Sequence, residues 1–439
     1  MSYVILLNTL MVALYILYMV RIFRTLGAHI FPLLYLIIIS SWILSSVYAL
    51  DFGGTYIFEL RITSTQSFAT SALVLCNIVF FEGIFSYLKK RDYSITPIID
   101  KPLILPKKLQ LLDFSINILV LIVYSSFVIT GIPLLSGMDR ASYWDLVSEI
   151  PIINIVLGNY LLISFLVGLN YGLRKKMGQK AGWSFFQLIS IIVFFILAGN
   201  KFSALFSIIT NFLISPTFLG VFDSISFKRL FKIGFASIGF FLIVIFIQSN
   251  TYSLSSESYG KYKIFSYLFQ RVFVLQGELW WKTFQDIIVE GQFDSGHLME
   301  ELNAVFFRTQ ESYTGLRYLM IESANGSFIY EILKGNYMYT GAFPAIIIAT
   351  FTKVLVLPVL FVLGRLIAIL LLIFKKLHFK RSLFRLYLIY VLYSTCLSMI
   401  LGGAFGNFFM LSNVLRVIIL LGITLLIHDN YKRIKIQTN

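Results

Sequence analysis

The chain has 439 residues, of which 58% are hydrophobic and 13% are charged, and its mean hydropathy is +0.84. A soluble globular domain carries about 25% charged residues, so this composition excludes one and predicts an integral membrane protein. The net charge of +15 does not indicate a nucleic-acid partner, because Lys and Arg gather in short connectors between apolar segments, as is typical of cytoplasmic loops.

Apolar blocks of about 20 residues predict transmembrane helices rather than a β-barrel, since each helix satisfies its own backbone hydrogen bonds in lipid. The first block lacks a preceding basic region and a small-residue cleavage site, so it predicts a retained helix rather than a signal peptide. The predicted spans, in chain order, are 2–20, 28–50, 66–88, 110–132, 152–172, 184–199, 202–221, 233–248, 341–374, 383–403 and 408–428.

The expected fold class is an all-α polytopic membrane protein with about 11 transmembrane helices. It divides into an N-terminal transmembrane bundle at 1–248, a large, partly helical polar loop at 249–340, and C-terminal transmembrane helices with a short tail at 341–439. One set of alternating connectors is strongly basic, whereas the short connectors of the other set carry only Arg61, Arg140 and Lys201. This bias places the N-terminus and the polar loop outside and the C-terminus in the cytoplasm.

One predicted span is too long. Residues 341–374 would extend about 50 Å as one helix, whereas the hydrocarbon core is about 30 Å thick. The segment also contains Lys353 and Pro358. A steeply tilted or kinked helix is one solution. We favour the other, in which 341–352 lies along the outer surface or dips into the membrane from it.

Several kinds of function lack their sequence signals. Cys76 and Cys396 both fall inside predicted helices, so neither a disulfide framework nor a metal site is expected. No GxxxxGK[ST] motif is present, which argues against ATP-driven activity in this chain. The polar chemistry gathers instead in the loop 249–340, which holds ten of the 21 acidic residues.

Cations on the predicted outer side suit a lipid-linked diphosphate, because guanidinium groups grip phosphate oxygens through paired donors. The candidates are Arg140, Lys201, Arg271 and Arg416. Arg416 lies inside the last predicted span, where a buried arginine costs at least about 2.5 kcal/mol and so needs a polar cavity or a partner. Lys201 could equally be a snorkelling turn residue.

Glu278 follows Arg271 by seven residues and is followed at once by Trp280 and Trp281. In a helix, Arg271 and Glu278 would share one face. The carboxylate could accept a proton from an attacking hydroxyl, while the indoles could pack on a sugar. The alternative is an interfacial amphipathic helix with its tryptophans at headgroup level. His297, the only histidine of the loop, is a second candidate base.

This layout resembles the bacterial oligosaccharide repeat-unit polymerases, the Wzy-type O-antigen polymerase family. The resemblance covers most of the chain. It rests on the helix count, the late outer loop, the connector with Arg140 after GIPLLSG, the Asn200–Lys201 turn, and the segments RVFVLQGELWW and NGSFIYEILKGNYMYTG. There are two departures. The family usually has arginine where Lys201 stands, and the RX10G pattern of some members is missing, since Pro151, Lys282 and Phe328 occupy the eleventh positions after Arg140, Arg271 and Arg317.

The resemblance implies a GT-C-like membrane glycosyltransferase of the bacterial inner membrane, with its loop and N-terminus in the periplasm. It would transfer a glycan from undecaprenyl diphosphate to a lipid-linked repeat unit, without nucleotide sugar, metal or other cofactor. A chain-length-regulating co-polymerase is an expected partner.

Three other functions stay open. An O-antigen ligase would use the same donor with lipid A-core as acceptor, and His297 suits it. A lipid-linked oligosaccharide flippase would be expected to show inverted repeats, which are not evident. A scaffolding subunit would not need an arginine such as Arg416 inside a span.

Overall fold

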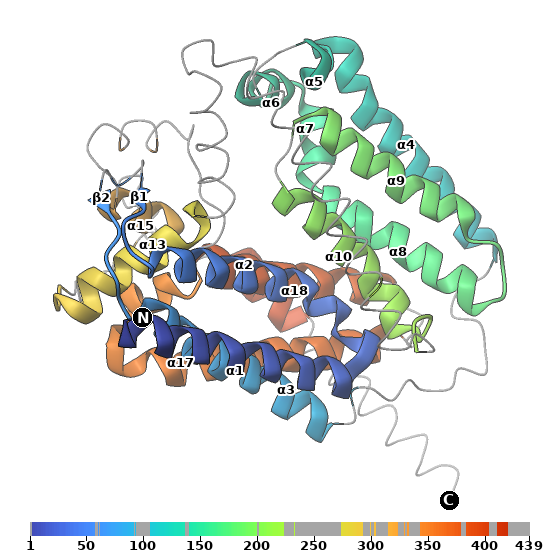
Figure 1. Ribbon diagram of the computed structural model, residues 1–439. Coiled ribbons are helices and arrows are strands. Elements are labelled where there is room, and N and C mark those ends of the chain that lie inside the picture. Colours follow the sequence, from blue (N-terminus) through green and yellow to red (C-terminus); the bar gives the residue numbers. More distant parts are fainter. Residues whose placement is uncertain are drawn as a thin grey trace, which may run out of the picture. The chain divides into compact units, whose positions relative to one another are not determined.

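A computed structural model describes residues 2–57, 62–91, 106–136, 140–199, 202–223, 274–292, 315–323, 343–378, 383–403 and 411–419, together with isolated positions between them. The chain divides into two compact units (Figure 1). The first unit comprises Met1–Ile16, Ile39–Arg91 and Phe273–Asn439, and the second comprises Leu17–Ile38 and Asp92–Val272. The predicted domains, with boundaries at 248 and 340, are continuous segments of the sequence. The two units of the structure instead group segments that pack together, so each unit contains separate parts of the sequence.

The described residues include five helical stretches that are long and apolar enough to cross a membrane, or six when the bent pair Pro151–Gly158 and Tyr160–Lys176 counts as one span. The chain is therefore a helical membrane protein. The stretches are Tyr3–Leu50, Ala69–Lys90, Leu109–Ser136, Lys353–His378 and Phe384–Gly402. The predicted span at 233–248 lies almost wholly outside the described residues.

Two helices and a short hairpin begin the chain. Helix α1 (Tyr3–Leu26) and helix α2 (Leu34–Leu50) are separated by a 3-10 turn, η1 (Gly27–Leu33). The hydroxyls of Thr9 and Tyr48 lie 2.8 Å apart, so the chain reverses between the start of α1 and the end of α2. This reversal agrees with a break between the first two predicted spans. Strands β1 (Tyr56–Ile57) and β2 (Ile62–Thr63) follow as an antiparallel pair that pairs Tyr56 with Thr63.

Helix α3 (Ala69–Lys90) packs closely against α17 (Ala345–His378). A Cβ on Gly83 would lie 2.4 Å from the carbonyl oxygen of Phe361, and one on Gly364 would lie 2.3 Å from that of Phe80. Real Cβ atoms do not approach backbone this closely, so both glycines are needed for the helices to touch. Helix α18 (Leu383–Gly402) adds to the same packing through Tyr390 and Tyr393, whose rings contact Phe374 of α17.

Replacement of Gly364 by alanine is expected to lower the unfolding temperature of the detergent-solubilised protein. The new methyl group forces α3 and α17 apart, and overpacking of this kind costs about 1–3 kcal/mol. The matched control is Gly402→Ala at the end of α18, where no atom of the described residues beyond the helix's own backbone lies within 4 Å of the added Cβ. An equal loss of stability in both variants would show that the close contact is not what matters.

Helix α17 is bent. The ring of Phe343, just before the helix, lies 4.8 Å from the ring of Phe80, and Gly364 also lies against Phe80. About 20 residues of straight helix would extend about 30 Å, so the stretch between these two contacts cannot be straight. Pro358 lies inside the helix and provides a cause, because proline removes a backbone hydrogen bond.

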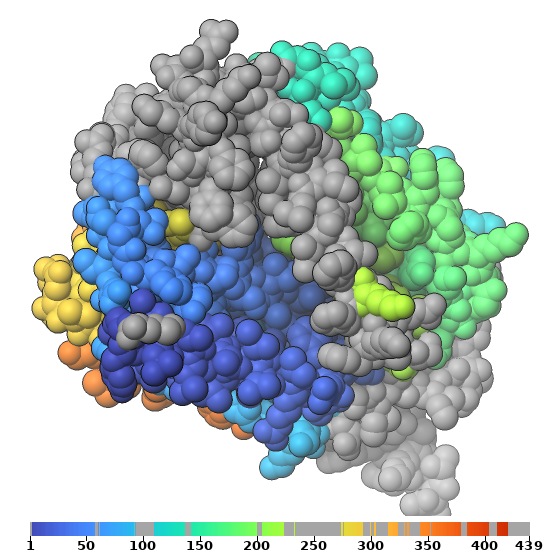
Figure 2. All heavy atoms as spheres, in the orientation of Figure 1, coloured from blue at the N-terminus to red at the C-terminus, as the bar shows by residue number. Residues whose placement is uncertain are grey.

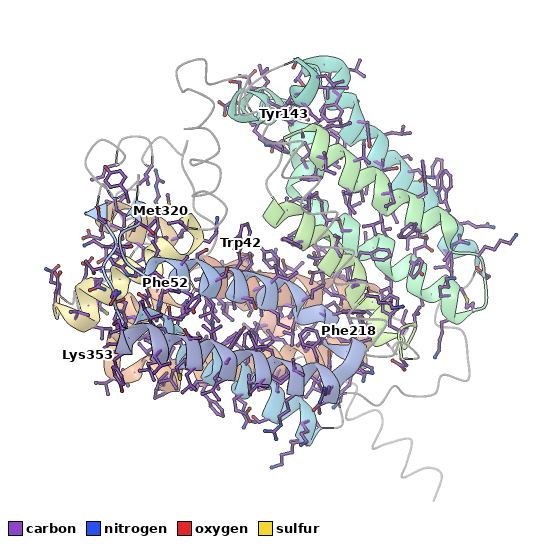
Figure 3. All side chains as sticks on the ribbon, viewed as in Figure 1. Trp42, Phe52, Tyr143, Phe218, Met320 and Lys353 are labelled. Carbon is purple, nitrogen blue, oxygen red and sulfur yellow. The ribbon has the colours of Figure 1, made fainter. Side chains whose placement is uncertain are left out.

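This bend bears on the overlong predicted span. The structure begins α17 at Ala345 and keeps it helical through Lys353, which Figure 3 labels. Residues 345–350 are all buried in protein. The stretch of α17 that is long and apolar enough to cross a membrane is Lys353–His378. The favoured path of 341–352, along the outer membrane surface or dipping into the membrane from it, stays a prediction.

The second unit contains the helices between α3 and the polar loop, together with the turn η1. They are α4 (Pro106–Thr130), α5 (Pro133–Ser136), α6 (Arg140–Ser148), α7 (Pro151–Gly158), α8 (Tyr160–Lys176), α9 (Gly182–Leu197) and α10 (Phe202–Phe218). Helices α8 and α10 touch closely at Gly168, where a Cβ would overlap the carbonyl of Phe212. Arg174 of α8 forms an ion pair with Asp113 of α4, and Asn170 donates to the same carboxylate. Polar groups therefore tie helices together in this unit.

Candidate functional site

The clearest structure in the described part of the polar loop is helix α13 (Leu275–Thr283), which continues into a π-helical turn, η2 (Phe284–Val289). Residues 277–281 are all buried, and so are Thr283 and Phe284. A helix that is covered on almost every side belongs to a protein core rather than to a membrane surface. This burial argues against the interfacial amphipathic helix that the sequence left open.

Helix α13 is docked on the ends of α2 and α3 by two contacts. At Gly277 a Cβ would lie 2.6 Å from the backbone nitrogen of Val47 in α2, so only glycine allows the approach. The indole Nε1 of Trp280 donates a 2.8 Å hydrogen bond to the carbonyl oxygen of Ala69, the first residue of α3. Figure 3 labels Phe52, just after α2, and Met320, on α15 (Leu316–Ser323), which also packs against α13. The loop helix is thus part of the first unit.

The start of α3 is capped by side chains from three other positions. The first backbone N–H groups of a helix have no partner within the helix. Here the N–H of Ala69 donates to Ser67 Oγ at 3.3 Å and the N–H of Thr70 donates to Asp51 Oδ2 at 2.8 Å. The N–H of Ser71 donates to Asn8 Oδ1 at 3.2 Å. A buried polar cluster therefore joins α1, the end of α2 and α3; we define the Asp51 cluster as Asn8, Asp51, Ser67, Thr70 and Ser71.

Asp51 is the centre of this cluster and is 1% exposed. Its carboxylate accepts hydrogen bonds from Ser67 Oγ at 2.5 Å, Thr70 Oγ1 at 2.7 Å and Asn8 Nδ2 at 3.0 Å, in addition to the N–H of Thr70. Burial raises the pKa of this carboxyl above its usual value, and the hydrogen bonds from Ser67 and Thr70 oppose that rise. The indole of Trp281 also faces the carboxyl and stabilises its charged form, although the contact does not have the geometry of a hydrogen bond.

Glu278 lies in the first turn of α13 and is fully buried, with 0% exposure. The N-terminus of a helix stabilises negative charge, so this position suits a carboxylate. A carboxyl group shielded from bulk water can exchange a proton with a bound hydroxyl. In the conformation described, however, protein covers both of its oxygens. Proton transfer to or from a substrate therefore requires the covering chain to move aside.

Trp280 and Trp281 are 1% and 3% exposed. Neither ring offers a free face for stacking on a sugar in this structure. Trp280 instead anchors α13 to α3, and Trp281 faces Asp51. The structure thus gives these two side chains a part in holding Glu278 in place, which the sequence did not suggest.

The structure describes only some of the cations that the sequence singled out. Arg416 lies in a helical stretch at 411–419, is half-buried, and donates from Nη1 to Asn413 Oδ1 at 2.8 Å. Since Asn413 is 5% exposed, this guanidinium has a polar partner inside the protein, as the cost of burial requires. Arg140 is the first residue of α6, and its side chain lies outside what the structure describes. Lys201, Arg271 and His297 also lie outside the described residues.

The Asp51 cluster was missed by the sequence analysis because its members are widely separated along the chain. Asn8 lies 43 residues from Asp51, and nothing in the sequence pairs them. A signal was nonetheless present, since Asp51 directly follows an apolar span and the next span is preceded by TSTQS at 63–67, a run rich in helix-capping residues. No group of three or more metal-ligating side chains occurs among the described residues.

Comparison with known proteins gives one match. Residues 309–417 match the model of a family of unknown function (DUF6418). This region is less than half of the chain and includes α15, α17, α18 and most of the helical stretch that carries Arg416. No curated protein and no solved structure matches the chain. The chain is therefore similar to this family over its C-terminal part.

Proposed function

We propose that this protein is a membrane-embedded glycosyltransferase that polymerises lipid-linked oligosaccharide repeat units into O-antigen or a related surface polysaccharide. It would act at the periplasmic face of the bacterial inner membrane, through about eleven transmembrane helices in a GT-C-like arrangement. The donor and the acceptor would both be oligosaccharides carried on undecaprenyl diphosphate. The resemblance to the Wzy-type polymerases carries the choice of substrate.

The observation that best supports an enzyme is the docking of α13. If the polar loop were only a connector, its charged side chains would be expected to lie in water. Instead Glu278, a carboxyl that is 0% exposed, sits on a helix fixed to the ends of α2 and α3. A buried carboxyl on a rigid support is what a positioned general base needs.

The proposed reaction is a single displacement at carbon. A hydroxyl of the acceptor sugar attacks the anomeric carbon of the donor, the bond from that carbon to the diphosphate oxygen breaks, and undecaprenyl diphosphate leaves with its electron pair. The hydroxyl proton passes to a base, for which Glu278 and His297 are the candidates. Cations among Arg140, Lys201, Arg271 and Arg416 would stabilise the negative charge that develops on the leaving diphosphate.

Deletion of the gene, followed by a gel of the lipopolysaccharide or surface polysaccharide, tests this proposal. The expected result is loss of the polymer ladder with a single repeat unit still attached to core, and return of the ladder when the gene is restored. Complete loss of repeat units from core would instead favour a ligase or a flippase. Those two differ in whether long polymer accumulates on undecaprenyl diphosphate, as it does only when a ligase is missing.

A further inference from the structure

Two arginines lie on one tyrosine ring at the C-terminal end of α3. The guanidinium carbon of Arg91 lies 5.8 Å from the centroid of the Tyr87 ring, and that of Arg365, on α17, lies 5.1 Å from the same centroid. Arg365 also lies 5.0 Å from the ring centroid of Phe361. Distances of this size allow cation–π attraction. Both guanidinium groups are therefore held against the same ring although they come from helices far apart in the sequence.

The backbone fixes this arrangement. Gly83 lies one turn before Tyr87 on α3, and Gly364 directly precedes Arg365 on α17. These are the glycines at which the two helices touch. Because the helices cannot slide past such a close crossing without a clash, the positions of Tyr87 and Arg365 relative to each other are set by the fold rather than by flexible side chains.

The cluster is electrostatically incomplete. No ion pair among the described residues includes Arg91 or Arg365. Lys89 and Lys90, both exposed on the same turn of α3, add further positive charge. Cations at the end of α3 also complement the negative end of the helix dipole. The helix dipole does not explain the position of Arg365, because this residue is half-buried in the middle of α17, more than three turns before the end of the helix.

We propose that Arg91 and Arg365, held on Tyr87, bind the phosphate headgroup of an anionic membrane lipid. Tyr87 and Arg91 lie at the end of the candidate membrane span Ala69–Lys90, which is the level of lipid headgroups. Arg365 lies within the candidate span Lys353–His378, and a long arginine side chain can reach the headgroup level from within a span. Guanidinium groups bind phosphate through paired hydrogen bonds, and anionic headgroups attract basic residues at the membrane surface. The connector that follows α3 belongs to the basic set, so the lipid would lie in the cytoplasmic leaflet. This inference does not depend on the proposed reaction.

The test measures the unfolding temperature of the full-length protein in a neutral detergent, with added phosphatidylglycerol or phosphatidylcholine. The wild-type protein is expected to be stabilised more by phosphatidylglycerol. Arg91→Gln should lose part of that difference, and Arg91→Gln combined with Arg365→Gln should lose most of it. Because each variant is compared with itself in the two lipids, a general loss of stability does not affect the result, and Arg91 is exposed, so its replacement leaves the fold intact.

The matched control is Lys89→Gln with Lys90→Gln, which removes the same charge from the same turn without touching the Tyr87 ring. This control should keep the lipid-dependent difference. The proposal is overturned if the control loses it equally, because surface charge alone would then explain the effect. It is also overturned if phosphatidylglycerol gives no extra stability, or if inorganic phosphate stabilises as well as the lipid does, which would indicate a site for free anions.

Discussion

Replacement of Asp51 by alanine is expected to destabilise the protein severely, by at least about 3 kcal/mol, and to reduce its amount in membranes. The carboxylate is the shared acceptor for Asn8, Ser67 and Thr70, and it caps the start of α3. Alanine leaves those buried donors without an acceptor, and each unsatisfied buried group costs about 1–3 kcal/mol. The measurement is the unfolding temperature in detergent, alongside protein levels by immunoblot.

Asp51→Asn is the matched control, because an amide keeps one acceptor oxygen and nearly the same shape. Its loss of stability should be well below that of Asp51→Ala. Equal stability of Asp51→Ala and the wild-type protein would contradict the role assigned to the cluster.

The pH dependence of stability follows from the raised pKa of Asp51. Since burial raises the folded-state pKa above the unfolded value, the folded state holds the proton more tightly than the unfolded state does. The resulting stabilisation is fully present below the unfolded pKa, about 3.9, and is lost as the pH rises through the folded pKa. Stability measured against pH should therefore fall over this range in the wild-type protein relative to Asp51→Asn, which cannot titrate. Parallel curves for the two proteins would show that Asp51 has no raised pKa.

Replacement of Glu278 by glutamine is expected to lower polymer formation by at least about 100-fold, the usual size of a general-base contribution, while the protein level stays near normal. Glutamine keeps the volume and the polar atoms of the buried side chain but cannot take up a proton. Glu290→Gln is the control, because Glu290 is exposed just after η2 and should tolerate the change. Polymer of normal length and amount in Glu278→Gln would remove this residue from the mechanism and favour His297 as the base.

The sequence predicted several of the membrane helices well because their signal is local. Long apolar stretches identify α3, α4 and α18 to within a few residues, since a span in lipid needs only its own hydrogen bonds. The bend of α17 was harder. The length of the segment and Pro358 indicated that it could not be one straight span. The bend itself depends on packing against Phe80, which lies more than 260 residues away from Phe343 in the sequence.

The candidate site was predicted less fully, for a related reason. The composition of LQGELWW drew attention to Glu278, yet exposure cannot be read from composition, and both tryptophans proved to be buried. Asp51 escaped notice because its partners come from α1 and α3. A polar residue at the end of a span looks the same in sequence whether it faces water or caps a neighbouring helix.

Polymerisation is tested most directly by an assay of the purified full-length protein in lipid vesicles, supplied only with undecaprenyl-diphosphate-linked repeat units. We expect a ladder of lipid-linked polymers and release of undecaprenyl diphosphate, without added nucleotide sugar, and loss of both in Glu278→Gln but not in Glu290→Gln. Well-folded protein that leaves the repeat units as single units would contradict the assignment as a polymerase.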